Sequence, residues 1–218
     1  ADDRIPSESS ASMSIDPKKR APWEVFVNAR GERFVREDHP SVNARDRSMD
    51  LQPGHRFWAV FDQQILDQAP PLIPGWPREQ LLDAFNQHPM FARAGSLGEL
   101  GVITGIDPAA LARNIRDYNS ALEKKVPDPF NRSHRPLPVS RPPFYAIRSQ
   151  AWTLKSYAGL AVNKDLQVIS REGEPVGNLY AAGEVLGAAT SGKSHTSGGS
   201  VTPAVAFGRL LGHKIIQF

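Results

Sequence analysis

The sequence predicts an α+β protein built from two parts. Apolar residues recur at helical spacing in 107–125 and 202–216, whereas several short runs alternate apolar and polar residues as strands do. Between these regions, residues 126–143 contain six prolines and cannot form a regular element. We interpret this stretch as a long crossing loop, and 218 residues suffice to bury a sizeable core on either side of it.

The first part begins with a lead-in and a hairpin. Residues 1–21 are polar and rich in Ser and Pro, which is typical of a poorly ordered linker. Residues 23–35 alternate around a turn at 28–31, so we expect a β-hairpin there. The run 55–61 predicts another strand. The polar stretch between them, 37–54, is interpreted as an irregular loop of the kind that often carries function.

Helices are expected next, and then β structure. Residues 78–88 and 96–106 predict two helices, the second starting at Ser96. A third has Asp107 as N-cap and Pro108 in its first turn. After the crossing loop, 144–182 reads as a series of strands, and a final helix is expected from a Thr202 cap with Pro203 next.

Composition excludes several classes of function. The net charge is only +3 and the basic residues are scattered, so nucleic acid is not indicated as a partner. No cysteine is present, and the six histidines show no metal-binding spacing, so no metal is expected. There is no apolar run long enough for a membrane span and no signal-peptide pattern at the start, which favours a cytoplasmic location.

One short motif suggests a nucleoside triphosphatase. Residues 187–194, GAATSGKS, match the phosphate-loop pattern at every position. That loop requires a helix to begin at its Gly-Lys-Ser, yet Gly198 and Gly199 follow closely and the helix signals come only at Thr202. No acidic residue occurs in the last 18 positions to hold magnesium. We therefore interpret the match as accidental, and the segment as a glycine-rich loop leading into a helix; a flexible surface loop is the alternative.

The C-terminal region resembles a known family. The order GLAVNKDLQVISREGEPVGNLYAAGEVLG, then a Gly-Gly loop and TPAVAFGRLLG, is similar to the end of flavoproteins of the fumarate reductase/succinate dehydrogenase superfamily, which includes 3-ketosteroid dehydrogenases. GERFV at 31–35 resembles the hairpin that opens the family's substrate-capping domain. The resemblance implies a cap or substrate domain at 22–143 and the closing, C-terminal part of a Rossmann-like FAD-binding domain at 144–218.

FAD is the cofactor that the resemblance implies. Glu184 would hydrogen-bond a ribityl or ribose hydroxyl, and backbone N–H groups at the start of the last helix would stabilise negative charge on the reduced flavin. The implied cofactor-binding residues are Ala182, Gly183, Glu184, Gly198, Gly199, Ser200, Val201 and Thr202.

The N-terminal half of such an FAD site has no counterpart in the sequence. No G-x-G-x-x-G occurs anywhere. We therefore expect this chain to be a C-terminal fragment whose partner is the N-terminal FAD-binding half of the same protein. Alone, it should bind FAD weakly or not at all.

Arg45 is the first catalytic candidate. Soluble fumarate reductases use an arginine in a T-R-D-K-like stretch, and Ala44-Arg45-Asp46-Arg47 stands at a similar place here. The alternative is a loop arginine paired with Asp46. The family's substrate-binding arginine before the Gly-Gly is Thr196 here, and its histidine segment contains Lys155 instead, which weakens the case for a dicarboxylate, although Lys155 could supply one charge.

Two further acid–base candidates are considered, and the first follows from the ketosteroid dehydrogenase likeness. His195 stands where those enzymes place a tyrosine that polarises the substrate carbonyl, and it could hydrogen-bond a carbonyl; the alternative is a solvent-facing loop histidine. Tyr157 is a second candidate, with simple packing as the alternative. The dehydrogenases' tyrosine base would fall near Ser41, which cannot serve unaided.

Together these features predict part of an FAD-dependent oxidoreductase. It would transfer hydride between flavin N5 and a substrate C–C bond beside a carbonyl or carboxyl group, so the partner is a small enoate or enone. The competing interpretation is a ligand-binding or interaction module that kept the architecture without redox chemistry.

Overall fold

The computed structural model describes residues 13, 16–150, 158–189 and 199–216. The chain divides into two compact units, Ala1–Ala151 and Trp152–Phe218. We expected the division between residues 143 and 144. It falls later because strand β4, Phe144–Gln150, pairs with Arg56–Asp62 along its whole length and with Phe91–Ala94 over its first four residues.

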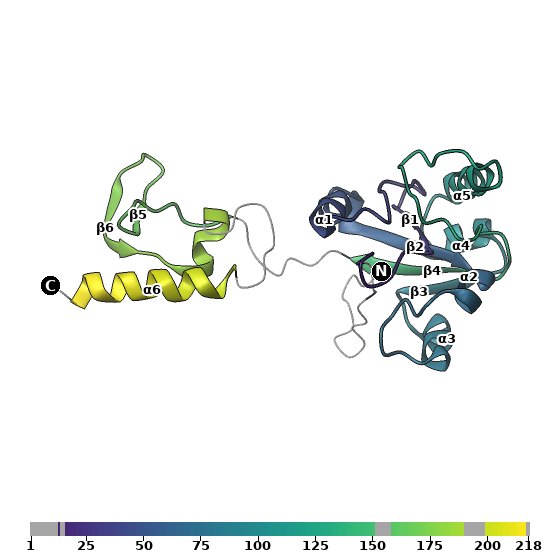
Figure 1. The fold of residues 1–218 in the computed structure, drawn as a ribbon, viewed down its shortest axis with the longest axis horizontal. Coiled ribbons are helices and arrows are strands. Elements are labelled where there is room, and N and C mark those ends of the chain that lie inside the picture. The colour runs from purple at the N-terminus through teal and green to yellow at the C-terminus, as the bar shows by residue number, and fades with distance from the viewer. Residues whose placement is uncertain (1–12, 14–15, 151–157, 190–198, 217–218) are drawn as a thin grey trace. The chain divides into compact units, whose positions relative to one another are not determined.

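The first unit is an antiparallel sheet with helices around it. The strand order is β1-β2-β4-β3, and Figure 1 shows α5 toward the β1 side and α3 beside the β3 edge. The elements in chain order are β1 (Val25–Val27), α1 (Val42–Asp50), η1 (Pro53–His55), β2 (Arg56–Asp62), α2 (Gln63–Gln68), α3 (Arg78–Gln87), β3 (Phe91–Ala94), α4 (Leu97–Thr104), α5 (Pro108–Glu123) and β4.

Aromatic side chains fill one face of this sheet. Phe57 on β2 packs against Phe26 on β1, with ring centroids 5.1 Å apart. Phe61 stacks on its cross-strand neighbour Tyr145, with ring centroids 5.4 Å apart, and the ring centroid of Phe85 in α3 lies 4.6 Å from that of Tyr145. Such pairs contribute beyond the area they bury. The sheet and α3 therefore share one apolar core.

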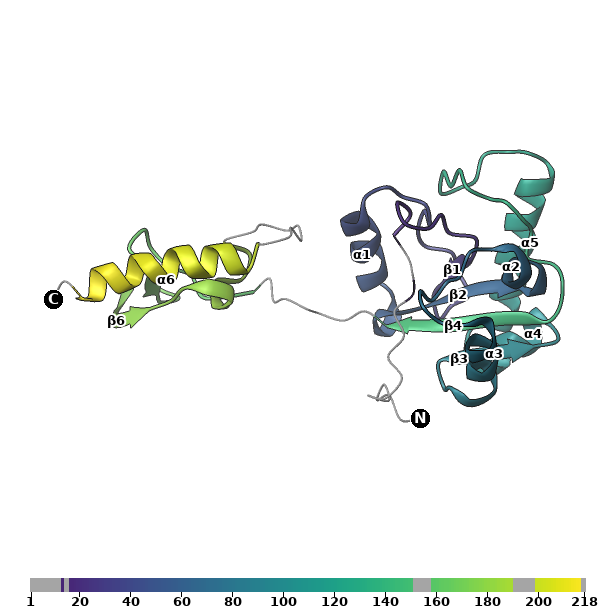
Figure 2. The same ribbon diagram turned by 60° about the horizontal axis from the view of Figure 1, so that its bottom comes forward.

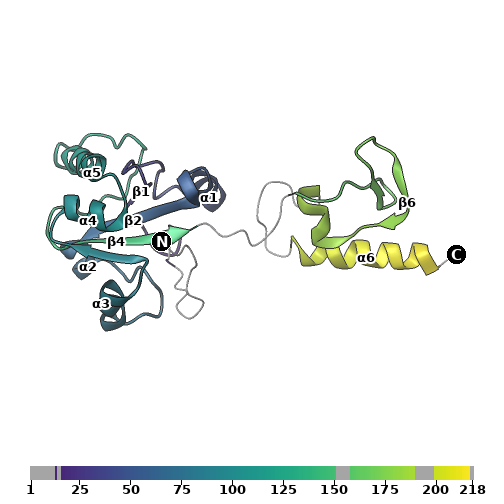
Figure 3. The ribbon, with the colours of Figure 1, turned by 180° about the vertical axis from the view of Figure 1, so that it is seen from behind.

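The second unit is smaller. Strands β5 (Gln167–Ile169) and β6 (Pro175–Tyr180) form an antiparallel pair, followed by η2 (Gly183–Ala189) and α6 (Val201–Ile216). Helix α6 lies along the β5–β6 pair in the views of Figures 1, 2 and 3. The buried apolar cluster of the second unit consists of Val168, Ala181 and Leu186, and Phe207 of α6 packs against it.

Most helices start where the sequence predicts. Ser96 caps α4 through a 3.2 Å bond from Glu99 N to its hydroxyl, and Asp107 caps α5 through Ala110 N at 2.6 Å. The 126–143 stretch contains no helix or strand, as expected. The second arm of the first hairpin is shorter than the sequence predicts. Its pairing with the first arm is a single bridge between Val27 and Arg33.

The region interpreted as an irregular loop contains helix α1, so that interpretation was wrong. Ser41 accepts a hydrogen bond from Ala44 N at 3.3 Å and starts the helix. Met49 and Arg45 form its buried face, and Met49 joins the core. Because the stretch has few apolar residues, its helical period is weak in the sequence, and packing on β2 decides the conformation.

Candidate functional site

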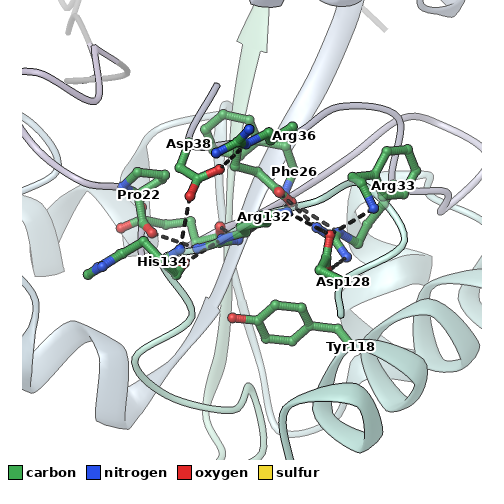
Figure 4. Close-up of polar contacts among 12 residues, drawn as sticks. Pro22, Phe26, Arg33, Arg36, Asp38, Tyr118, Asp128, Arg132 and His134 are labelled. Carbon is green, nitrogen blue, oxygen red and sulfur yellow. Dashed lines mark hydrogen bonds and ion pairs between the residues drawn. The ribbon is translucent and has the colours of Figure 1, made fainter. Parts of the chain in front are cut away.

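Among the buried charges of the first unit, two groups differ in how they are hydrogen-bonded. The first set, which we call the paired cluster, consists of Arg33, Glu37, Asp128 and Arg132. These side chains are at most 8% exposed. Figure 4 shows Arg33 and Asp128 turned toward each other, with the ring of Tyr118 beside them.

Within the paired cluster, Arg33 joins two carboxylates. Its Nη2 lies 2.8 Å from Glu37 Oε2, and its Nη1 lies 2.6 Å from Asp128 Oδ2. Burial would lower the pKa of Arg33, but Glu37 and Asp128 raise it above the usual value. Burial likewise would raise the pKa of Asp128, and Arg33 with two backbone N–H groups brings it below normal. The charges are therefore matched and hydrogen-bonded.

Arg132 anchors the crossing loop to the outer edge of β1. It donates to the carbonyl oxygens of Glu24 at 2.7 Å and Pro22 at 2.6 Å. Glu37 Oε1 accepts from Phe26 N at 3.3 Å on the same edge. The Arg132 and Glu37 side chains thus hydrogen-bond backbone groups that an exposed edge strand would leave free to pair with another chain. The paired cluster therefore has a structural role.

Arg45 is the second kind of buried charge. Its exposed fraction is 0%, and its Nε, Nη1 and Nη2 have no hydrogen-bond partner among the residues that the structure describes. Arg45 sits on a helix rather than in a loop, and its guanidinium makes no hydrogen bond to Asp46, although the charge of Asp46 acts on it. Burial lowers its pKa, and the charges of Asp46 and Asp16 only oppose this.

A buried guanidinium without hydrogen-bond partners is costly. Taking such a charge out of water without partners is disfavoured by several kcal/mol. Its planar fork of five donors suits a carboxylate or another planar anion. The chemistry of this group therefore fits an anionic ligand, which would supply the missing acceptors.

Helix α1 is held in place by a hydrogen-bond bridge to the first turn. Asn28, 1% exposed, donates to Gln52 Oε1 at 3.1 Å, and Gln52 donates to Ser48 O at 2.6 Å. The Asn28 Oδ1 atom also accepts from the N–H groups of Arg30 and Glu32. Sequence reasoning missed this bridge, because an Asn in a turn is ordinary and nothing local marks its distant partner.

The second unit brings together the expected cofactor-binding segments. Gly183 has φ +85, and a Cβ there would lie 3.4 Å from Ala204 Cβ in α6. Glu184 next to it is exposed. Gly199 and Ser200 form the turn before α6, which begins at Val201. The A-A-G-E segment and the start of α6 are therefore neighbours, as a shared ligand would require.

Several expected site residues lie outside the described residues. These are Lys155, Tyr157, His195, Thr196 and Gly198, together with most of the phosphate-loop match. In the parts that the structure does describe, no cluster of three or more potential metal ligands occurs, and no helix is long and apolar enough to cross a membrane.

Comparison with known proteins supports the flavoprotein resemblance. Residues 17–201 match the FAD binding domain family. A probable fumarate reductase of Shewanella frigidimarina is 28% identical over 91% of this chain, which spans 32% of that protein. An open-conformation flavocytochrome c3 fumarate reductase has a TM-score of 0.57 at 26% identity, over 94% of this chain and 34% of that one.

A second solved structure shares the fold. The 3-ketosteroid Δ1-dehydrogenase of Sterolibacterium denitrificans has a TM-score of 0.69 at 22% identity, covering 97% of this chain and 42% of that one. The chain thus spans about a third of the length of the fumarate reductases it matches. The predicted cofactor, FAD, is confirmed by the family match. The chain belongs to the FAD binding domain family.

Proposed function

We propose that this chain carries the substrate cap and the closing part of the flavin domain of an oxidoreductase that reduces or oxidises a C–C bond next to a carboxylate or ketone. The observation that carries the proposal is Arg45, fully buried with no hydrogen-bond partner in the described chain. The probable fumarate reductase of Shewanella supports a carboxylate substrate.

Arg45 would bind the substrate through its guanidinium fork. A carboxylate accepting two of its N–H groups would be oriented, and negative charge developing beside the reacting carbons would be stabilised where water is excluded. Burial lowers the pKa of Arg45, which is the direction that proton donation would need. The bound FAD would supply hydride exchange at N5.

The cofactor contacts in this chain would come from the second unit. The Glu184 carboxylate would accept hydrogen bonds from flavin-chain hydroxyls, and the free N–H groups at Gly199, Ser200, Val201 and Thr202 would face the flavin edge. Ala182 and Gly183 would allow close backbone approach. His195, Tyr157, Lys155 and Thr196 remain the proposed residues for polarising or binding the substrate.

Anaerobic flavin reoxidation tests this function. The FAD-loaded, chemically reduced protein from the complete reading frame would be mixed with fumarate, acrylate or an androstenone, and the return of oxidised-flavin absorbance followed. We expect an enoate to reoxidise the flavin. Arg45→Met should slow the rate by about 10²–10³-fold, whereas Arg47→Met, an exposed arginine on the same helix, should not.

The outcomes separate the alternatives. If only the androstenone reoxidises the flavin and Arg45→Met does not change the rate, the substrate is a ketone. His195 then becomes the main candidate for polarising its carbonyl group. Binding of these compounds without any reoxidation would support the ligand-binding module.

A further inference from the structure

The inward face of helix α1 gives the helix little reason to keep one orientation. Positions 45, 48, 49 and 52 are buried or half-buried, whereas 46, 47, 50 and 51 are exposed. The fully buried side chains of α1 are Met49, which is apolar, and Arg45, whose guanidinium has no hydrogen-bond partner among the described residues. A helix of nine residues is also only marginally stable by itself. Met49 therefore supplies the one buried apolar contact against the tendency of the Arg45 charge to reach water.

A modest rotation of α1 would expose Arg45. Neighbouring side chains leave an α-helix roughly 100° apart. A rotation by one position would therefore bring Arg45 to the exposed direction in which Asp46 now points. Because a buried guanidinium regains its hydration by such a move, the rotation is favoured electrostatically. Another part of the fold must oppose it.

Gln52 links the end of α1 to the rest of the unit. Its Nε2 donates to Ser48 O in the last turn of α1 at 2.6 Å, and its Oε1 accepts from Asn28 Nδ2 at 3.1 Å. Gln52 follows Arg45 by seven positions, which is close to two helical turns, so both belong to the same side of the helix. Figures 1 and 2 show α1 near the start of β2. The bridge therefore fixes the side of α1 that carries Arg45.

The other end of the bridge is anchored in a rigid turn. Asn28 is 1% exposed, and its Oδ1 accepts from the N–H groups of Arg30 and Glu32 at 2.9 and 3.1 Å. Gly31 of this turn has φ +72, and a Cβ there would lie 2.6 Å from Leu111 N in α5. The turn therefore packs directly on the α5 backbone, and it offers α1 a fixed point of attachment.

Two other contacts at the ends of α1 do not oppose the rotation. Ser41 accepts from Ala44 N at 3.3 Å, and this cap satisfies a backbone donor whichever side of the helix faces inward. His55 Nδ1 lies 2.7 Å from Asp50 O, but it joins two exposed residues that follow each other closely in the chain. The Asn28–Gln52 bridge thus remains the polar contact that can hold the orientation.

We propose that Gln52, together with Asn28, is a positioning residue for Arg45. The bridge keeps the Arg45 guanidinium inside the unit before a substrate binds, so that its donors are already in place. The inference rests on the proposed function for the identity of the ligand alone. Without the bridge, α1 turns Arg45 outward for most of the time, and an anionic substrate binds only the inward fraction. The apparent affinity falls by that fraction, and the bound complex stays the same.

Arginine modification mapped by mass spectrometry tests the proposal. The FAD-loaded protein from the complete reading frame would be treated with phenylglyoxal, which reacts with accessible guanidinium groups. We expect Arg45 to react slowly in the parent and about 10-fold faster in Gln52→Met, which removes the bridge and keeps the side-chain length. Leu51→Met, the same replacement at the neighbouring residue, which is 83% exposed, should leave the Arg45 rate unchanged.

Two buried arginines serve as internal controls for the fold. Arg33 and Arg132 belong to the paired cluster and should react slowly in the parent and in both variants. If Arg45 alone becomes reactive, α1 has moved and the rest of the unit is intact. If all three arginines become reactive together, the bridge supports the whole unit and the proposal is wrong.

Flavin reoxidation by acrylate supplies a second readout. Gln52→Met should raise the acrylate concentration that gives the half-maximal rate about 10-fold and keep the maximal rate, because only the inward population changes. Arg45→Met should lower the maximal rate itself. A Gln52→Met protein with a reduced maximal rate at an unchanged half-saturating concentration would contradict the positioning role.

The modification rates also decide the matter without turnover. An Arg45 that reacts no faster in Gln52→Met than in the parent would overturn the proposal. So would a parent in which Arg45 reacts as fast as Arg47, which is exposed on the same helix. If acrylate does not reoxidise the flavin of the parent, the proposed enoate chemistry fails, while the reactivity of Arg45 still shows whether the bridge holds it.

Discussion

Arg33 and Arg45 are both buried in the same unit, but of these two only Arg33 is hydrogen-bonded to carboxylates among the described residues. Arg33 contacts two buried carboxylates, and aromatic rings lie over it: its Cζ is 5.0 Å from the Phe130 ring centroid. Arg45 has no hydrogen-bond partner in the described chain. A buried charge that is compensated holds the fold together, and one that is not compensated is available to a ligand.

The largest expected effect comes from breaking the paired cluster. Glu37→Ala should lower the free energy of unfolding by about 3–5 kcal/mol, because it leaves two buried guanidinium groups short of a partner. Urea unfolding followed by tryptophan fluorescence measures this. Glu32→Ala, at an exposed acid that pairs with Arg30, should cost under about 1 kcal/mol. Equal losses in the two variants would contradict the role assigned to the cluster.

Asp128 of the paired cluster, together with Asp38 outside it, should also make stability depend on pH. The pKa values of Asp128 and Asp38 are lowered in the folded protein, since arginine charges and backbone N–H groups outweigh burial. Their contribution is therefore complete above the unfolded pKa near 4 and is lost as pH falls through the folded values. Urea midpoints at pH 7, 5, 4 and 3 should fall at the acid end. Asp128→Asn should flatten that fall; an unchanged slope would argue against the assignment.

A smaller loss is expected at the bridge that holds α1. Asn28→Ala removes a buried side chain with four hydrogen bonds and should cost about 1–3 kcal/mol. The double variant with Gln52→Ala should cost less than the sum of the two single changes, because the residues share a bond. Additive losses in a double-mutant cycle would show that the bridge does not couple the turn to α1.

Much of the fold is predictable because local signals agree with the tertiary structure. Asp107 and Pro108 start α5, and Ser96 starts α4, as caps and fixed φ angles dictate. Helices α1 and α2 and strand β3 were not predicted. All three are short and are decided by packing on the sheet, which a local pattern does not contain.

The candidate site was predictable only in part. Family resemblance pointed to Arg45 and to the A-A-G-E segment. The isolation of the Arg45 charge could not be read from the sequence, where Asp46 stands next to it: side chains at adjacent helical positions do not face each other. The pairing of Arg33 with Asp128, 95 positions away, is likewise a property of the folded chain alone.

The most direct test of the contrast is the free energy of unfolding of Arg45→Met, measured beside Arg33→Met. Met keeps much of the apolar stem and removes the charge. We expect Arg45→Met to be as stable as the parent chain or more stable, because a buried unpaired charge disappears, while Arg33→Met loses about 3–5 kcal/mol. A loss of several kcal/mol in Arg45→Met would show that its charge supports the fold, and would contradict its assignment to a ligand.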